Sequence, residues 1–168
     1  MNDPRIAVAW RSLKGSEMSD KDSTDVFDAA GTYSFTTGLG TFRIVARQDD
    51  GVTLWLGDEW LGTYPDASVV CGSFEHDPED DNTATNPMVI VEVLSDSTEA
   101  YDRGEKFAHY RRIPSLRDYV LVSQYEPLIE HYTRDEDGTW TFHEVRPPAS
   151  VRLSIGGELP VAAIYDDP

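Results

Sequence analysis

The sequence has few of the features that mark secreted or membrane proteins. It contains one cysteine, Cys71, in 168 residues, so a disulfide framework and a cysteine-rich zinc site are both excluded. No segment approaches the roughly 18 consecutive apolar residues of a membrane-spanning helix. The apolar run at residues 6–10 is too short for the core of a secretory signal. We therefore expect a cytoplasmic protein that does not bind membranes.

Basic residues are scarce and unevenly placed. The chain has 14 Lys and Arg against 31 Asp and Glu, a net charge of −17, and no basic residue lies between Arg47 and Arg103. The charge then changes sign in a basic segment that comprises Arg103, Lys106, Arg111, Arg112 and Arg117. An acidic half that could hold cations thus meets a short segment that could hold phosphate. The simpler alternative is a solvated acidic surface beside one base-rich helix.

Two parts of the chain differ in their patterns. Residues 1–31 form a short N-terminal segment, weakly structured apart from a candidate helix at 3–14, and residues 32–168 form one domain. In that domain, alternating apolar residues predict a hairpin of 41–46 with 52–56 and a second hairpin of 128–132 with 140–145. A strand at 67–71 is followed by an acidic loop at 75–86.

The centre of the predicted domain is a strand–helix–strand unit at residues 87–122. The almost continuously apolar stretch 87–94 predicts a strand buried on both faces. Helical spacing covers 101–113 and stops before Pro114, and a second buried strand follows at 119–122. A short strand at 151–155 and a helical turn at 160–165 close the chain. The fold class is therefore α/β (α+β): a mixed β-sheet with a central strand–helix–strand unit and flanking hairpins.

Glu92 is the sharpest anomaly, because it lies inside the apolar strand 88–94. A buried carboxylate is costly unless it is paired or binds a metal. The alternative is that Glu92 lies at the end of the strand, where its side chain reaches solvent or pairs with an arginine. Asp66, which opens the strand 67–71, is by itself also explained as an ordinary turn residue.

The predicted helix places three polar side chains on one stripe. Asp102, Lys106 and Tyr110 are spaced at i, i+4 and i+8, and Phe107 beside them is expected to anchor the helix in the core. Asp102 and Lys106 could form only a surface ion pair. However, just six residues, 95–100, separate strand and helix, so Lys106 is predicted to face the strand end near Glu92, where α/β sheets usually bind ligands.

An aspartate, a glutamate and a lysine at a strand end suit phosphodiester hydrolysis. Carboxylate oxygens bind Mg²⁺ or Mn²⁺, and the bound metal lowers the pKa of a water and neutralises phosphate charge. The Lys106 ammonium would orient that water or stabilise the developing oxyanion. The four histidines show no ligand spacing, and Cys71 is expected to be buried and inert.

Three stretches resemble the Uma2-type (DUF820) family of the PD-(D/E)xK, restriction-endonuclease-like superfamily. These are residues 64–72 around Pro65-Asp66, residues 91–112 and residues 113–122. The resemblance implies a restriction-endonuclease-like fold in which Asp66 and Glu92 hold Mg²⁺ or Mn²⁺. It implies that Lys106 is a lysine moved from the strand to the helix, since Leu94 occupies the usual lysine position. Asp102 and Tyr110 match recurrent helix positions and are possible supporting residues.

These observations predict a metal-dependent nuclease that acts on nucleic acid, and DNA is the expected substrate. Arg103, Arg111 and Arg112 would contact the substrate backbone, and a homodimer that pools its basic helices would offset the charge of −17. Because residues 1–31 are short compared with the family's N-terminal part, a catalytically degenerate, acidic protein-interaction module is the main alternative. A glycoside hydrolase that uses Asp66 and Glu92 is a third hypothesis, but it leaves Lys106 without a role.

Overall fold

The computed structural model describes the backbone of residues 26–27, 32–37, 40–45, 54–56, 59–61, 65–73, 75–77 and 80–165. Side chains are described for residues 65–73, 75 and 84–165. The predicted helix at 3–14 lies outside these residues. The first strand, β1, falls within the predicted segment 1–31 and pairs with β2.

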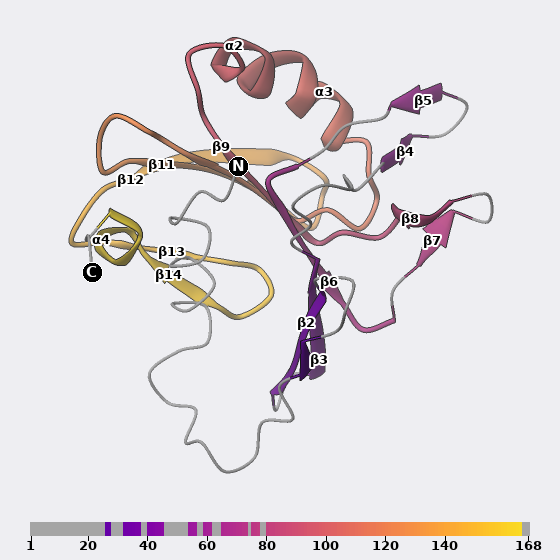
Figure 1. Ribbon diagram of the computed structural model, residues 1–168. Coiled ribbons are helices and arrows are strands. Elements are labelled where there is room, and N and C mark those ends of the chain that lie inside the picture. Colours follow the sequence, from indigo (N-terminus) through magenta and orange to yellow (C-terminus); the bar gives the residue numbers. More distant parts are fainter. Residues whose placement is uncertain are drawn as a thin grey trace.

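A mixed sheet of eight strands organises the molecule (Figure 1). Its spatial order is β1-β2-β3-β6-β9-β10-β11-β12. The strands are β1 (Val26–Phe27), β2 (Thr32–Thr37), β3 (Gly40–Val45), β6 (Ala67–Cys71), β9 (Val89–Val93), β10 (Asp118–Val122), β11 (Ile129–Arg134) and β12 (Trp140–Val145). Among these strands β9 and β10 pair in parallel, and the other neighbours are antiparallel.

Three small two-stranded sheets accompany the large one. They are β4 (Leu54–Leu56) with β5 (Glu59–Leu61), β7 (His76–Asp77) with β8 (Asp80–Ala84), and β13 (Ser150–Arg152) with β14 (Glu158–Pro160). The β13–β14 pair continues into the short helix α4 (Val161–Tyr165), which confirms the predicted helical turn at the end of the chain.

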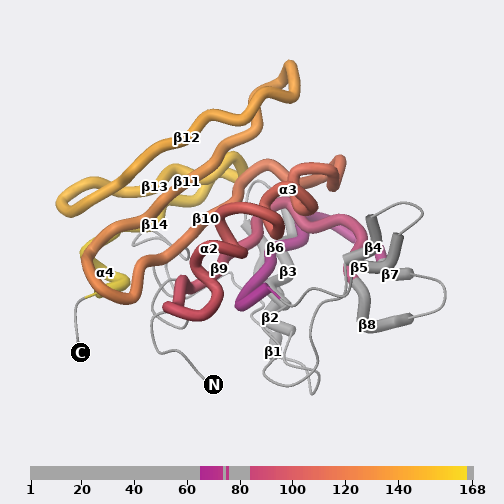
Figure 2. Tube along the Cα trace, turned by 90° about the horizontal axis from the view of Figure 1, so that it is seen from above, coloured from indigo at the N-terminus to yellow at the C-terminus, as the bar shows by residue number. Residues whose placement is uncertain are grey.

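A helical stretch connects the two parallel strands. It consists of α2 (Glu99–Tyr101), the π-helical segment η1 (Asp102–Lys106) and α3 (Phe107–Tyr110). These helices cover one face of the sheet, whereas β13, β14 and α4 lie against the other (Figures 1 and 2). The predicted fold class and its central strand–helix–strand unit are confirmed.

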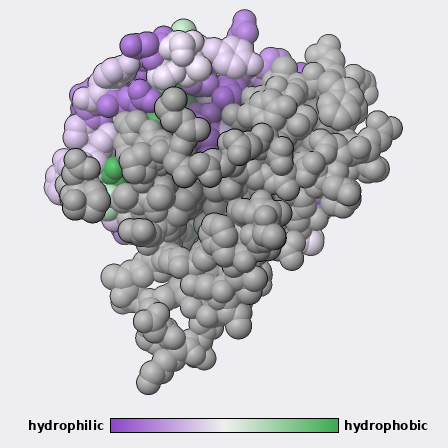
Figure 3. Space-filling model, in the orientation of Figure 1, coloured by the Kyte–Doolittle hydropathy of each residue, from purple (hydrophilic) through white to green (hydrophobic). Residues whose placement is uncertain are grey.

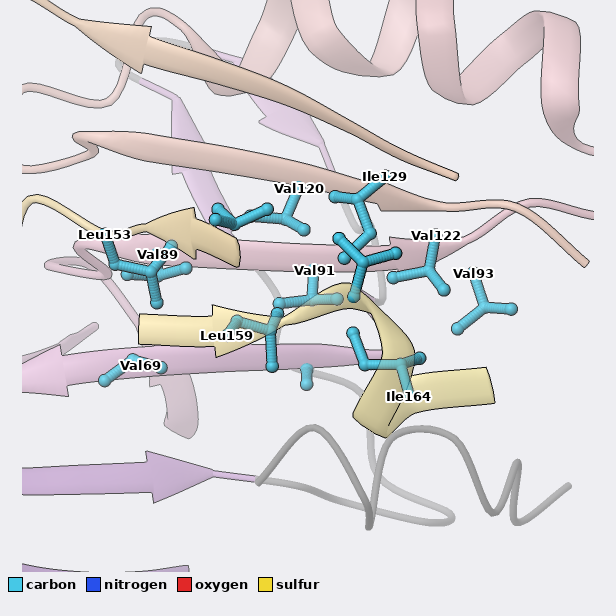
Figure 4. Packing of buried hydrophobic residues seen from close by; sticks show 13 residues of the cluster. Val69, Val89, Val91, Val93, Val120, Val122, Ile129, Leu153, Leu159 and Ile164 are labelled. Atoms are coloured by element: carbon cyan, nitrogen blue, oxygen red, sulfur yellow. The ribbon is translucent and has the colours of Figure 1, made fainter. Parts of the chain in front are cut away.

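Each face of the sheet has its own core because side chains alternate along a strand. On β9, Val89, Val91 and Val93 face the C-terminal elements and pack with Leu159 and Ile164 (Figure 4). Ile90 and Leu94 join the cluster beneath the helices, with Tyr110, Tyr119 and others. All five residues of β9 are buried, as predicted for a central strand. Glu92 has the parity of Ile90, so it projects toward the helices.

The helix differs from its predicted range of 101–113. It begins at Glu99, where the N–H donates to the carbonyl of Ser95, and it ends at Tyr110. After Tyr110 the Arg112 N–H donates to the His109 carbonyl and the Ile113 N–H to the Tyr110 carbonyl, so a tightened turn replaces the last predicted residues of the helix. Periodicity also gives no sign of the π-helical segment, because a single widened turn leaves the apolar pattern nearly unchanged.

The hairpin predicted from 41–46 and 52–56 is wrong. Strand β3 pairs instead with β2 and β6, and β4 pairs with β5. The register pairs Thr37 with Gly40, so only two residues connect β2 and β3. This short connection favours pairing of β3 with β2 over pairing with the more distant residues 52–56. The acidic stretch 75–86 is not simply a loop, since it contains the β7–β8 pair. Strand β14 was not predicted.

The second predicted hairpin is confirmed. Strands β11 and β12 pair from Ile129↔Val145 to Arg134↔Trp140, and the turn places Gly138 at a φ of 86°, which glycine adopts without strain. The described surface visible in Figure 3 is predominantly hydrophilic. Within the described residues, none of the helices combines the length and apolar character needed to cross a bilayer.

Candidate functional site

Glu92 lies at the centre of a polar cluster beneath the helix. Its side chain is almost fully buried, with the residue 2% exposed. Its Oε1 accepts a hydrogen bond from the Tyr110 hydroxyl at 2.9 Å and lies 2.8 Å from the Lys106 Nζ. The carboxylate that the sequence marks as anomalous is therefore paired by two groups from the helix, as its burial requires.

Asp66 reaches Glu92 from the neighbouring strand. Because β6 and β9 are antiparallel with Ala67 opposite Val91, Asp66 comes opposite Glu92 one position beyond the last pair. The Asp66 N–H donates to Glu92 Oε2 at 3.4 Å, and the Val93 N–H donates to Asp66 Oδ2 at 2.7 Å. Asp66 is exposed, so its contact with Glu92 lies where the buried cluster borders solvent.

Lys106 is held between two carboxylates. Its Nζ lies 2.8 Å from Glu92 Oε1 and 3.2 Å from Asp102 Oδ1, and Asp102 is itself 2% exposed. The Tyr119 hydroxyl donates to the Asp102 backbone carbonyl at 3.0 Å, which ties this turn of the helix to β10. The π-helical segment therefore has the sheet on one side and presents both Asp102 and Lys106 to the site.

Burial and ion pairing act in opposite directions on the pKa of each member of the pair. Burial raises the pKa of Glu92 to about 7, because the charge of Lys106 lowers it less and the charge of Asp66 raises it. Burial lowers the pKa of Lys106, but the charges and hydrogen bonds of Glu92 and Asp102 together outweigh it, so that pKa lies above its ordinary value. Lys106 is thus kept as an ammonium while Glu92 titrates near neutrality.

The donor set fits a divalent cation of the Mg²⁺ type. Within the described residues, no three His, Cys, Asp or Glu side chains converge on one point, so the site offers two carboxylates. Mg²⁺ is commonly bound by one or two carboxylates and completes its shell with water and substrate phosphate. Asp66 and Glu92, joined by the hydrogen bond from the Asp66 N–H to Glu92 Oε2, could supply these carboxylates.

The structure gathers five of the predicted site residues in one place: Asp66, Glu92, Asp102, Lys106 and Tyr110. The three arginines behave differently. Arg103 donates to both carboxylate oxygens of Glu130 and to Glu99, so it is already paired within the chain. Arg111 and Arg112 follow α3 and are exposed.

Tyr119 was missed by sequence reasoning. An aromatic residue in a buried strand has the appearance of a core residue, and its ring does stack on Phe107 at 5.3 Å between centroids. Its hydroxyl contact with the helix backbone and its edge-on packing against the Tyr110 ring, 5.4 Å between centroids, connect it to the site. Cys71 is half-buried, and burial followed by the charge of Asp118 raises the pKa of its thiol to about 11, which agrees with an inert cysteine.

Solved structures give one informative likeness. A crystal structure from Anabaena variabilis, described as "a putative nuclease belonging to DUF820", aligns with a TM-score of 0.55 at 18% identity. The alignment covers 73% of this chain and 68% of that one. At this identity the likeness shows a shared fold.

Sequence comparison adds closer relatives and a family. Two uncharacterized proteins of Synechocystis are 43% identical over 107 residues and 35% identical over 92 residues. These matches cover 61% and 55% of this chain, and the chain spans about half the length of both relatives, 54% and 52%. The family model Uma2, described as "Putative restriction endonuclease", matches residues 15–162, which include every site residue above. The chain therefore belongs to the Uma2 family.

Proposed function

We propose that this protein is a nuclease that hydrolyses DNA phosphodiester bonds with the help of Mg²⁺ or Mn²⁺. The observation that carries the proposal is the buried Lys106–Glu92 pair, which meets Asp66 at the solvent-facing end of a sheet. Membership of a family described as restriction endonucleases agrees with that chemistry.

Asp66 and Glu92 would hold the metal. When bound, the metal lowers the pKa of a coordinated water and neutralises charge on the phosphate. Tyr110 fixes Glu92 Oε1 on the helix side, which leaves Oε2 directed toward Asp66. Tyr110 and Asp102 are thus positioning residues, the first for Glu92 and the second for Lys106.

Lys106 would act on the attacking water or on the developing oxyanion. Its raised pKa keeps it protonated at neutral pH, so it supplies a fixed positive charge and hydrogen-bond donors. Because the ammonium lies within 3.2 Å of both Glu92 and Asp102, it has little freedom and needs little reorganisation when substrate binds.

The test is cleavage of supercoiled and single-stranded DNA in Mn²⁺ by the wild type, Lys106→Ala and Glu92→Ala. We expect both variants to lose at least about 100-fold in rate, the size expected for one electrostatic contact to the transition state. Glu92→Ala should also lose Mn²⁺ binding in calorimetry, whereas Lys106→Ala should keep it. Glu158→Gln, at the exposed first residue of β14, is the matched control and should resemble the wild type.

Equal cleavage by the wild type and Lys106→Ala would show that Lys106 has no catalytic role. If the wild type neither cleaves DNA or RNA nor takes up Mn²⁺, the nuclease is excluded, and the acidic protein-interaction module becomes the better hypothesis. Metal-independent cleavage of a glycoside would favour the carboxylate-pair hydrolase instead.

A further inference from the structure

The described arginines fall into two groups. Arg103, Arg146 and Arg152 each form an ion pair with a glutamate. In the part of the chain whose side chains are described, a second group has no carboxylate partner: Arg111, Arg112, Arg117 and Arg134. In a protein with a net charge of −17, four arginines without an acidic partner require an explanation.

These four arginines lie together at the end of the helix. Arg111, Arg112 and Arg117 belong to the connection between α3 and β10. Strand β11 brings Arg134 beside them, because its N–H donates to the Arg117 carbonyl at 2.8 Å and its Nη1 donates to the Ile113 carbonyl at 3.0 Å. The guanidinium of Arg134 also lies 5.7 Å from the centroid of the Trp140 ring.

Among the described side chains, no nearby acid forms an ion pair with this group. Asp118, next to Arg117, points to the opposite face, where it bonds with His131 and Ser154. Asp135, Glu136 and Asp137 follow Arg134 in the hairpin turn, where Asp135 and Asp137 accept hydrogen bonds from Thr141 and Thr139. The arginine group is therefore a basic surface without a paired acid on a molecule of negative net charge.

We propose that this arginine surface, defined by Arg111, Arg112, Arg117 and Arg134, binds the phosphate backbone of the nucleic acid that the site would cleave. The inference rests on the proposed function. It implies that the bound strand runs along the helix, from Lys106 toward the arginine surface. Lys106 and Tyr110, the last residue of the helix, lie about 6 Å apart along its axis, and Arg111 and Arg112 follow directly. That length corresponds to about two nucleotides of a DNA strand at 3.4 Å each.

The arginine surface differs in part from the set of arginines that the sequence predicts to contact the substrate's phosphate backbone. Arg111 and Arg112 keep the role that the sequence predicts, whereas Arg103 is engaged by Glu99 and Glu130. Arg117 and Arg134 join the contact instead. Guanidinium groups suit this role because their planar fork matches the geometry of phosphate oxygens.

The test measures binding in the absence of metal, so that cleavage plays no part. The probe is a fluorescein-labelled DNA duplex of about 20 base pairs in EDTA, followed by fluorescence anisotropy over a range of salt. Arg111→Gln/Arg112→Gln is compared with Arg146→Gln/Arg152→Gln. Both pairs are exposed, and each double variant changes the net charge from −17 to −19.

Arg111→Gln/Arg112→Gln should lower the slope of log affinity against log salt by about 2, one per lost phosphate contact, while the control stays at the wild-type slope. Arg111→Lys/Arg112→Lys should restore most of the slope because the charge returns. An equal loss in both glutamine variants, no loss in the first, or a wild type that does not bind the duplex would overturn the proposal.

Cleavage with Mn²⁺ is measured separately on the same proteins. A wild type that binds through the arginine surface but does not cleave excludes the nuclease and keeps the surface. A wild type that cleaves while Arg111→Gln/Arg112→Gln binds and cleaves equally well keeps the nuclease and excludes the surface.

Discussion

At the scale of single residues, Glu92 carries a free-energy cost that its charge imposes on the fold. Burial raises its pKa from an ordinary 4.5 to about 7, so the folded protein binds the proton more tightly than the unfolded chain does. The corresponding stability is fully present below pH 4.5 and is lost as the pH rises to about 7. At 1.36 kcal/mol per pKa unit, the loss is on the order of 3 kcal/mol.

Glu92→Gln should therefore be more stable than the wild type at pH 8 without metal, because the amide resembles the protonated acid. Urea unfolding should show a gain on the order of 2 kcal/mol at pH 8 that falls below half by pH 5. Glu126→Gln, an exposed partner of Arg146, is the control and should show no gain. A Glu92→Gln protein less stable than the wild type at pH 8 would show that the Lys106 pair stabilises the fold.

At the scale of elements, a buried polar cluster connects the β13–β14 hairpin to the large sheet. Asp118, at the start of β10, is fully buried, and its Oδ1 lies 2.8 Å from His131 Nε2. Its Oδ2 accepts from the Ser154 N–H at 3.0 Å, just beyond β13. These bonds lie on the face of the sheet opposite Glu92. They connect the β13–β14 hairpin, which covers the core on that face, to the central strands.

Asp118→Ala should destabilise the protein by about 3 kcal/mol, since it leaves the buried His131 and the partly buried Ser154 N–H without their acceptor. Thermal unfolding measures this loss. The pKa of the Cys71 thiol, raised to about 11 by burial and then by the charge of Asp118, should fall, and its alkylation should speed up. Unchanged stability would contradict this connecting role, and lost Mn²⁺ binding in a folded variant would contradict the separation of the two faces.

The same scale shows what sequence patterns can and cannot predict. The apolar run of β9 and the turn after Arg134 identify their elements because each depends on residues close in sequence. The pairing of β3 was mispredicted because strand partners depend on competition among connections of different length. Lys106 was correctly expected near Glu92, since a short connection forces the helix back over its strand. The contact of Asp66 with Glu92 depends on the register of β6 and β9, which no local pattern encodes.

At the scale of the whole molecule, the proposed function would expose an approaching nucleic acid to two opposed electrostatic fields. The net charge of −17 repels phosphates at long range, while the arginine surface attracts them at contact. Salt separates the two effects, because the Debye length falls from about 30 Å at 0.01 M to about 8 Å at 0.15 M. Added salt therefore removes the distant repulsion while contacts a few ångströms apart are screened less.

For a DNA duplex this balance predicts an association rate that rises with salt between about 0.01 and 0.15 M, opposite to the usual trend for steered DNA-binding proteins. The dissociation rate should rise as well, because each phosphate contact competes with cations. Stopped-flow anisotropy in EDTA separates the two rates. Arg111→Gln/Arg112→Gln should steepen the rise in association rate, since less local attraction remains to offset the repulsion. An association rate that falls with salt would mean that the arginine surface, and not the total charge, controls the encounter.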